Sequence, residues 1–586
     1  MLANEEEHAR LVETARGDRP ADLFVRGGTI ANVYCGELHK GNVAVTSGRI
    51  AFVGEGERTV GPDTEIIDAK GMIVSPGYIE AHYHPWVLYN PVSLVEGVLP
   101  LGTTTIVADN LFFFMQTGHE GFAKMAGDLR GLPLLYLWMA RLTSQATFPG
   151  EKEMFGLDKI EPLLRRDDVL GTAEITRWPA LAAGDPDLIS GIRKAKSLGK
   201  IVDGHTGGAS ESRLQPVAAA GIDADHEAIT REEVLNRLRI GIWTMLRNSS
   251  LRPDLPELLR SVTEKGVSTH RLIMTTDGPS PEFIAEHGLV DGMLRVAVDN
   301  GVSPMQALQM VTINPATLFR IDGQIGGIGI GRRADLLILP DLASFRPETV
   351  ITQGRVVAER GELRVPLPDI EWDSYGSRPR FDPDLDLGDP ALYPQKLSAV
   401  GAEVPIIRLR SAVITERRDA QVRSENGLVV PDEGNLHAAL IDREGAWISR
   451  ALVSGFAPNL DGLASTYNTT THLLVLGRRP QSIARAARRV RELNGGIVVV
   501  EGEKVTFELA LPVSGMMSGL PFDDVVELNR RLARAVARAG YEHHDILYTL
   551  LFLTCDFLPA LRLTPLGLLD VKSSETLVAS ERLKTV

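Results

Sequence analysis

Apolar runs and helix-like polar segments alternate many times between residues 75 and 325. Strand-like runs such as TTTIVADN, PLLYLWMA and KIVDGHTGG are separated by helical segments such as PDLISGIRKAKSLG and REEVLNRLRIGIWTMLR. Repeated strand–helix order over this length is typical of a (β/α)8 barrel, whose chemistry lies at the C-terminal ends of its strands. We therefore predict a TIM-like barrel over residues 75–325 and look for functional side chains at its strand ends.

The two flanks of this region share a different pattern. Short β-rich runs broken by Gly and Asn occupy residues 21–74, and a similar piece returns at 326–365. We predict that the two pieces form one composite β-sandwich domain. A helical leader is expected over 1–20, a Pro-, Asp- and Gly-rich linker over 366–396, and a C-terminal α/β domain over 397–586. The predicted fold class is α/β.

Composition narrows the functional classes. The chain has 586 residues, 44% of them hydrophobic, and a formal net charge of −14, which argues against a nucleic-acid partner. Cys35 and Cys555 are the only cysteines, so a disulfide scaffold and a multi-thiolate zinc site are excluded. The sequence begins with no signal peptide and holds no run of about 18 apolar residues. We expect a cytoplasmic protein with no membrane partner. We also expect a homo-oligomer, namely a dimer, because the C-terminal unit is apolar enough to form a subunit interface.

One strand-like run carries unusual polar residues. In GYIEAHYHPW, residues 77–86, Glu80, His82 and His84 alternate with apolar positions and so share one face of a strand. Two imidazoles side by side at a strand end are suited to hold a metal ion. A His-x-His pair also arises by chance, so the pair needs support from the rest of the chain. We expect Glu80 to orient a ligand rather than to be one.

Further metal-binding residue types follow later strand-like runs, in barrel order. They are Glu174 in VLGTAEI, His205 in KIVDGHTGG, His226 in GIDADHEAI and Asp277 in RLIMTTDGP. Each alone could be a solvated carboxylate, a turn residue or a helix cap. Together, four histidines and two carboxylates suit a pair of divalent ions such as zinc, iron or manganese, which can hold a hydroxide nucleophile between them.

Several motifs carry a family resemblance. PGYIEAHYHP, NPATLFRI and GRRADLLIL, with the strand-end residues above, resemble the amidohydrolase superfamily. GHTGG, DADHE, LPVSGMMSGLPFDDV and LRLTPLGLLDV make the chain similar to the adenine deaminase family over nearly its whole length. The resemblance implies a hydrolase of cyclic amidine C–N bonds that converts adenine, its small-molecule partner, and water to hypoxanthine and ammonia. It also implies two divalent ions, manganese or iron, with zinc as the alternative.

The resemblance also assigns roles to individual residues. It makes five residues metal ligands: His82, His84, His205, His226 and Asp277. It makes Glu174 the carboxylate that bridges the two ions, where many relatives that cleave cyclic amides have a carboxylated lysine. Asp277 would take a proton from the attacking hydroxide and pass one to the departing amine. Glu227 is a candidate for the acid that protonates a ring nitrogen, or else an exposed glutamate in the first turn of a helix.

The chain departs from the family pattern in two places. PWVLYNP follows His84 where the family has Glu-Ser-Ser, and in NTTTHLL only His472 remains of a His-Asp-Ser-His-Asn motif. The first change supports an alternative substrate, N-6-methyladenine or another 6-substituted purine, with methylamine released from the methylated base. Trp86 in this loop could contact a purine or belong to the core. A second alternative is an inactive barrel that serves as a binding module, which a missing ligand would favour, and no ligand is missing.

Overall fold

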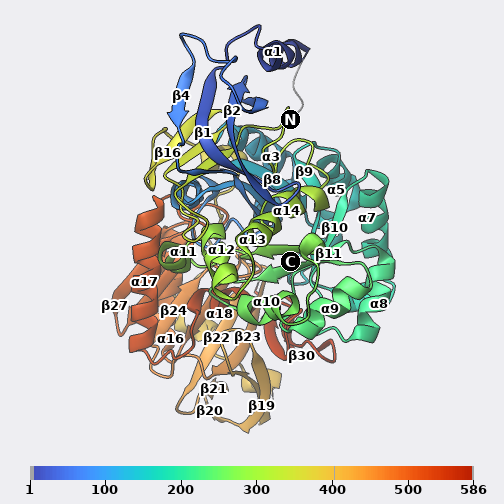
Figure 1. The fold of residues 1–586 in the computed structure, drawn as a ribbon. Helices are drawn as coiled ribbons and strands as arrows, with labels where there is room; N and C mark the ends of the chain where they lie inside the picture. The colour runs from blue at the N-terminus through green and yellow to red at the C-terminus, as the bar shows by residue number, and fades with distance from the viewer. Residues whose placement is uncertain (1–4, 401–402, 584–586) are drawn as a thin grey trace.

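The computed structural model describes residues 5–400 and 403–583, and its centre is a parallel eight-stranded barrel (Figure 1). Its strands are β6 (Tyr78–Tyr83), β7 (Thr103–Asp109), β8 (Leu135–Ala140), β9 (Val169–Ile175), β10 (Ile201–Gly204), β11 (Ala224–Asp225), β12 (Trp243–Arg247) and β13 (Leu272–Thr275). Each strand hydrogen-bonds to its neighbour in chain order. Almost every residue of these strands is buried, which explains why they appear as apolar runs in the sequence.

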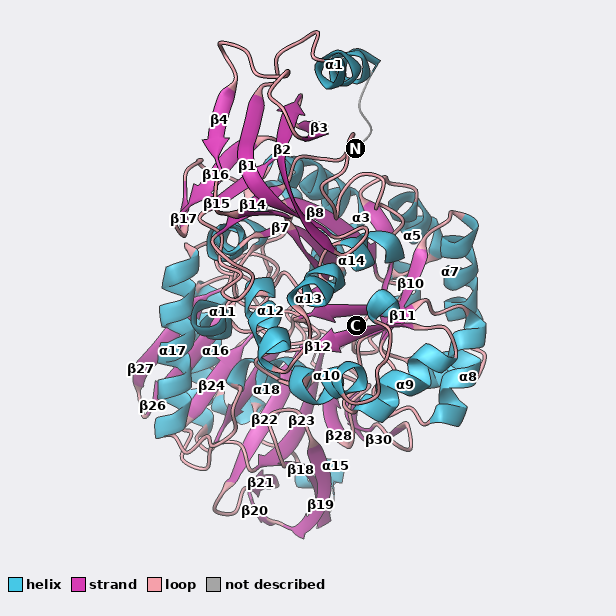
Figure 2. Cartoon of the chain, viewed as in Figure 1, coloured by secondary structure: helices cyan, strands magenta, loops and turns pink. Residues whose placement is uncertain are grey.

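Helices between the strands cover the outside of the barrel (Figure 2). They include α2 (Pro91–Val98), α3 (Leu111–Asp128), α5 (Leu157–Leu164), α7 (Pro186–Ser197), α8 (Glu211–Ala220), α9 (Arg231–Arg239), α10 (Leu255–Thr263) and α12 (Val290–Asp299). In α7, Leu188, Ile192 and Ala195 are buried, a spacing that places one apolar face of the helix against the strands. After α12, α13 (Pro304–Met310) and α14 (Ile313–Leu318) complete the barrel.

A side chain joins the first and last barrel strands. Thr276 donates to Glu80 Oε2 from its backbone N (3.0 Å) and from its hydroxyl (2.7 Å), and the Thr275 hydroxyl donates to Glu80 Oε1. The backbone N of His82 also donates to Oε1 (3.2 Å). Burial raises the pKa of Glu80 to about 7 against the lowering effect of these hydrogen bonds. The Glu80 carboxylate therefore fastens β6 to the end of β13.

The two flanks of the barrel form one nine-stranded sheet, in which the blue and yellow-green strands lie side by side in Figure 1. Its strands are β1 (Leu23–Asn32), β2 (Glu37–Thr46), β3 (Arg49–Gly54), β4 (Glu65–Asp68), β5 (Ile73–Pro76), β14 (Leu336–Leu339), β15 (Thr349–Thr352), β16 (Arg355–Glu359) and β17 (Glu362–Leu363). The antiparallel pair β5–β14 joins the two pieces. The helix α1 (Glu5–Arg16) lies beside β3.

A second nine-stranded sheet forms the centre of the C-terminal unit. It contains β18 (Glu403–Leu409), β19 (Thr415–Gln421), β22 (Asn435–Ile441), β23 (Trp447–Ser454), β24 (Gly462–Ser465), β25 (Leu473–Gly477), β26 (Gly496–Glu501), β27 (Lys504–Ala510) and β31 (Glu581–Arg582). Smaller elements of this unit are β20 (Arg423–Glu425), β21 (Leu428–Val430), β28 (Leu561–Thr564), β29 (Gly567–Asp570), β30 (Glu575–Ala579) and the short helix α15 (Leu397–Val400). The short helices α4 (Glu151–Met154) and α6 (Trp178–Ala182) belong to the barrel, where they follow β8 and β9. The helix α16 (Pro480–Glu492) packs on the sheet.

Two further helices connect this unit to the barrel. They are α17 (Phe522–Arg538), which packs against α2 and against α11 (Pro281–His287), and α18 (Ile546–Phe552). The predicted fold class, an α/β fold built on a (β/α)8 barrel, is confirmed, and the flanking pieces that were expected to form a β-sandwich form one nine-stranded sheet.

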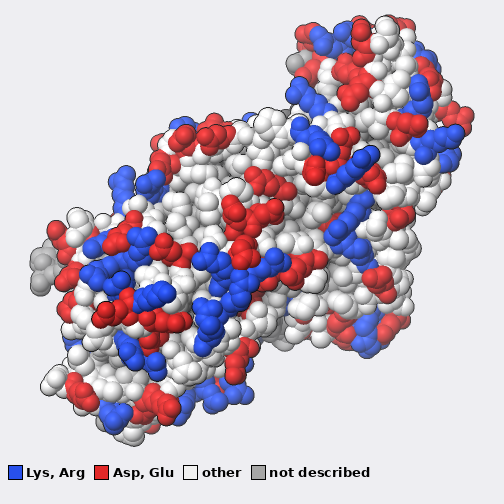
Figure 3. Space-filling model, turned by 90° about the vertical axis from the view of Figure 1, so that its left-hand side faces the viewer, with Lys and Arg blue, Asp and Glu red and all other residues white. Residues whose placement is uncertain are grey.

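The segment between the composite sheet and the C-terminal unit packs on the rest of the protein. The Trp372 ring stacks on Phe113 of α3, and the Tyr375 hydroxyl donates to Asp128 Oδ2 (2.7 Å). Lysine, arginine and acidic side chains are interspersed over the face drawn in Figure 3. Across residues 5–400 and 403–583, no helix has both the length and the apolar character needed to cross a bilayer.

Candidate metal centre

The barrel brings all six predicted metal-binding residues together at the C-terminal ends of its strands. His82 and Glu174 lie within β6 and β9, while His84, His205, His226 and Asp277 follow the ends of β6, β10, β11 and β13. Parallel strands of one barrel end at the same mouth, so side chains far apart in the sequence converge there. The residues form two neighbouring groups.

The first group contains His82, His84 and Asp277. Both Nε2 atoms of the histidines lie 3.1 Å from Asp277 Oδ1. Asp277 has a left-handed backbone with φ 60°, and the next residue, Gly278, has φ 78°. A Cβ atom on Gly278 would lie 2.9 Å from the Cβ of His84, so the close approach of this turn to His84 requires glycine.

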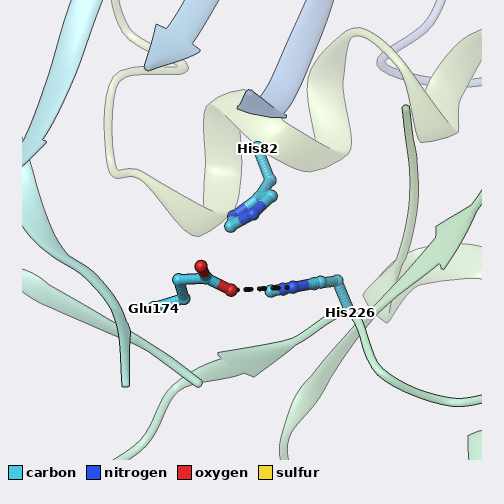
Figure 4. A group of neighbouring side chains, drawn as sticks. All are labelled: His82, Glu174 and His226. Atoms are coloured by element: carbon cyan, nitrogen blue, oxygen red, sulfur yellow. Dashed lines mark ion pairs between the residues drawn. The ribbon is translucent and has the colours of Figure 1, made fainter. Parts of the chain in front are cut away.

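The second group contains Glu174, His205 and His226. Glu174 Oε2 lies 2.6 Å from His205 Nδ1 and 3.3 Å from His226 Nε2. Its other oxygen, Oε1, lies 3.6 Å from Nε2 of His84 in the first group. Figure 4 shows His82, Glu174 and His226 pointing toward one another from three sides of the barrel. The Glu174 carboxylate thus lies between the two groups.

The chemistry of these side chains fits divalent metal ions. Two triads, His82 with His84 and Asp277, and His82 with Glu174 and His226, each place three ligand atoms within 4.8 Å of one another. His82 Nε2 and Asp277 Oδ1 are buried without a hydrogen bond, which is costly unless another partner binds them. Nitrogen and oxygen donors without thiolate suit zinc, iron or manganese. The centre can hold metal, and its donors face one another.

The His82 ring is held by an acidic residue. Its Nδ1 lies 2.7 Å from Asp203 Oδ2 on β10, which directs Nε2 toward Asp277. Glu80, expected to orient a ligand, contacts only the backbone N of His82 among the six residues. Asp203 therefore has the orienting role that the sequence suggested for Glu80.

A buried arginine neutralises the acidic side of the centre. Arg141, which follows β8, donates from Nε to Asp109 Oδ2 (2.6 Å) and from Nη2 to Glu174 Oε1 (2.6 Å). Burial alone would raise the pKa of Glu174, but the nearby His205 and Arg141 hold it well below its ordinary value. Glu174 is therefore ionised at neutral pH.

Glu227 is buried and paired with two arginines. It precedes α9, which begins at Arg231, and its exposed fraction is 6%, so the alternative of an exposed first-turn glutamate is wrong. Arg247 donates to Glu227 Oε1 (2.7 Å), and Arg252 donates to Oε2 (2.7 Å). Burial opposes ionisation, but Arg247, His205 and Arg252 hold the pKa of Glu227 below its ordinary value.

Arg247 also reaches the first group. It donates to Asp277 Oδ2 at 2.5 Å, and with His82 and His84 it holds the pKa of Asp277 well below the ordinary value despite burial. Arg141, Arg247 and Asp203 were not predicted from the sequence. Arg247 ends β12 and Arg141 directly follows β8, so the strand-end rule would have found both had it been applied to every polar residue.

A cavity of about 140 Å³ opens next to the centre. Glu174, Glu227 and Asp277 line it, and so does Trp86, whose ring lies 4.9 Å from that of His84. Tyr89 of the same loop lies in the core, where its hydroxyl donates to the Pro279 carbonyl (2.8 Å). Gln145, Arg247 and Arg252 of the barrel also line the cavity, and the C-terminal unit supplies a mostly apolar wall.

Comparison with known proteins agrees with this arrangement. Residues 73–357 match the amidohydrolase family, and residues 412–575 match the adenine deaminase C-terminal domain. An adenine deaminase of Rubrobacter xylanophilus is 34% identical over 592 aligned residues, 96% of this chain and 95% of that protein. A Bacillus cereus protein that bears the name "Putative adenine deaminase" is 33% identical over 566 residues, 96% of this chain and 94% of its own length.

Among solved structures, the beta-aspartyl dipeptidase of Fervidobacterium islandicum aligns with a TM-score of 0.46 and 18% identity, over 59% of this chain and 99% of that one. The two sequence relatives extend over nearly the full length of both chains, barrel and C-terminal domain alike. The chain therefore belongs to the adenine deaminase family.

Proposed function

We propose that this protein is a hydrolase that converts adenine and water to hypoxanthine and ammonia. The observation that carries the proposal is the position of Glu174, whose two carboxylate oxygens face the two groups of histidines separately. A carboxylate in this position is suited to bridge two ions. The adjoining cavity, lined by carboxylates and an aromatic side chain, is suited to a small flat base.

The proposed ligands of the two ions are the six residues of the two groups. His82, His84 and Asp277 would hold one ion, His205 and His226 the other, and Glu174 both. When bound, two manganese or iron ions, or zinc as the alternative, would supply hydroxide at neutral pH by lowering the pKa of water.

Asp277 is the proposed proton carrier. Arg247 keeps its carboxylate ionised, so at neutral pH Asp277 Oδ1 can accept a proton from water and later deliver one to the departing amine. The backbone of Asp277 is held at φ 60° beside His84, which places this carboxylate at the centre of the first group.

An acid that protonates a ring nitrogen must itself carry a proton, whereas Glu227 is ionised. Arg247 and Arg252 keep the carboxylate ionised, which disfavours Glu227 as the acid that protonates a ring nitrogen. In this state it can accept a hydrogen bond from a ring N–H of the base. We propose that Glu227 orients the purine through such a bond.

The test is an assay of the purified protein loaded with manganese or iron. Ammonia and hypoxanthine should form in equal amounts from adenine, and the chelator-treated protein should form neither. Binding of adenine without turnover in the metal-loaded protein would contradict the proposal and favour the alternative of a binding module.

A second candidate substrate, N-6-methyladenine, is favoured by the loop that follows His84. Trp86 and Val87 from this loop line the cavity and provide apolar surface near the metal centre. The same assay with N-6-methyladenine should then release methylamine. A higher kcat/KM for the methylated base would make it the preferred substrate. A higher kcat/KM for adenine would show that the loop does not select the methylated base.

A further inference from the structure

The wall of the cavity that faces away from the barrel belongs to the C-terminal domain. It is formed by Tyr548, whose hydroxyl donates to the Gly278 carbonyl, and by six apolar residues: Val413, Ile414, Leu551, Phe552, Phe557 and Leu558. The barrel supplies the charged lining, so neither part of the chain encloses the cavity alone. A ligand bound at the metal centre would lie between the two domains.

Phe557 is the residue of this wall that lies against His205. Its ring centroid is 5.4 Å from that of His205, at an interplanar angle of 83°. Phe552 packs behind it at 5.7 Å. Phe557 is half-buried, so part of its ring is free to contact a ligand. Trp86 stands beside His84 of the other group, so one aromatic side chain adjoins each group of ligands.

The residue before Phe557 anchors the wall to the barrel. Asp556 Oδ2 accepts hydrogen bonds from the backbone N and the hydroxyl of Thr147, both at 2.7 Å, and from Arg177 Nη2 at 2.8 Å. The backbone N of Asp556 donates to the carbonyl of Gln145 (3.0 Å). The side chain of Gln145 in turn donates to Glu174 Oε1 (3.1 Å). We call these contacts of Asp556 the latch.

We propose that the C-terminal domain completes the substrate site. In this proposal Phe557 contacts the face or edge of a flat heteroaromatic base, and Asp556 is a positioning residue that holds Phe557 beside His205. The identity of the base as a 6-aminopurine rests on the proposed function. The contact itself needs only an aromatic ligand at the metal centre.

Binding of hypoxanthine, the product of the proposed reaction, tests the contact without turnover. Titration calorimetry on the metal-loaded protein should show about tenfold weaker binding for Phe557→Leu, because stacking on an aromatic ring is lost. Phe557→Tyr keeps the ring and should bind within about threefold of the wild type. Phe381→Leu is the matched control, since Phe381 packs on the C-terminal core outside the cavity, and it should leave binding unchanged.

Steady-state kinetics with adenine separate a binding role from a general structural one. Phe557→Leu should raise KM about tenfold and leave kcat within about threefold, because the metal ligands are untouched. Equal affinity of the wild type and Phe557→Leu for hypoxanthine would overturn the inference. If the wild type still turned over adenine, the proposed function would remain supported. Hypoxanthine binding that weakens in Phe557→Leu without any adenine turnover would support the inference and refute the proposed function. A wild type that binds no purine would overturn both.

The latch is tested by a double-mutant cycle. Asp556→Ala should raise KM, and Asp556→Ala with Phe557→Leu should raise it no further than Phe557→Leu alone, because both changes remove the same contact. Asp461→Ala is the control, since Asp461 is a buried, arginine-paired aspartate of the same domain that does not line the cavity. Additive effects of the two changes, with normal thermal unfolding, would refute the positioning role.

Discussion

Two buried arginines set the charge of the metal centre. Arg141 joins Asp109 to Glu174, and Arg247 joins Glu227 to Asp277. Carboxylates buried this deeply would otherwise take up protons, which would weaken them as ligands and proton acceptors. His205 and Arg141 therefore keep Glu174 ionised, and Arg247 keeps Glu227 and Asp277 ionised, before any ion binds.

Arg141→Gln should destabilise the protein strongly when the metal has been removed. The change removes the arginine partner of buried Asp109 and leaves His205 as the remaining cationic partner of buried Glu174, which costs about 3–5 kcal/mol. Urea unfolding of chelator-treated protein measures the loss. Arg130→Gln is the control, because Arg130 is half-exposed beside Asp167 and Asp168, and its loss should cost about 1 kcal/mol or less. Equal losses for the two variants would contradict the argument.

Asp277→Asn should separate metal binding from proton transfer. The amide keeps an oxygen as a ligand but cannot carry the proton, so turnover of adenine should fall about 10³-fold. Plasma mass spectrometry should find the metal retained, and Asp341→Asn on an exposed turn should behave as the wild type. Loss of metal in parallel with activity would make Asp277 a ligand only, and full activity would remove it from the mechanism.

The sequence allowed the six metal-binding candidates to be predicted because each lies at or near the end of an apolar run. Arg141 and Arg247 also lie at strand ends, but arginine is not a metal-binding residue type, so the metal-ligand pattern does not include them. Phe557 had no local signal: nothing in LTCDFLP indicates that this segment folds over a barrel mouth hundreds of residues earlier in the chain. Contacts between distant segments depend on domain packing, which a single sequence does not reveal.

At the scale of elements, β6 contributes both to the metal centre and to the junction between the first and last barrel strands. It carries His82 and begins the barrel, and through Glu80 it also joins the end of β13. The alternation of YIEAHY predicted this strand correctly, because one polar residue per pair of positions is compatible with a strand. That Glu80 would fasten the barrel could not be predicted, since its partners Thr275 and Thr276 adjoin it only in the closed barrel.

Glu80→Gln should weaken this junction. An amide group offers one acceptor oxygen where the carboxylate offers two, so at least one donor of Thr275 or Thr276 is left unsatisfied. The expected loss is about 1–3 kcal/mol of unfolding free energy, together with a lower thermal midpoint. Glu362→Gln on the exposed strand β17 is the control and should change stability little. An unchanged midpoint in Glu80→Gln would show that the junction depends on other contacts.

At the scale of the whole molecule, the domains are interlocked. Phe522 at the start of α17 packs on Gly97 of α2, where an added Cβ would lie 2.6 Å from the ring. The Tyr548 hydroxyl of α18 donates to the carbonyl of Gly278, next to Asp277. The C-terminal domain therefore supports the metal centre as well as covering it.

A buried histidine should make this assembly sensitive to acid. Burial lowers the pKa of His437 in β22 to about 4, so the residue is neutral in the folded protein while the unfolded chain binds a proton below about 6.5. Stability is then full above about pH 6.5 and is lost as pH falls toward 4, by about 2 kcal/mol between pH 7 and 5. Urea midpoints should fall less over this range in His437→Gln than in the wild type. Exposed His270→Gln is the control, and parallel curves for all three proteins would refute the assignment.

The pairing of β5 with β14 has a consequence for synthesis on the ribosome. When the first five strands emerge, β5 has a neighbour in β1, but its other edge stays open until the entire barrel has been translated and β14 follows. An open strand edge invites pairing with other nascent chains. Every chain therefore passes through a stage in which its earliest strands are made but their sheet is incomplete, and chaperones that shield strand edges would act on it at that stage.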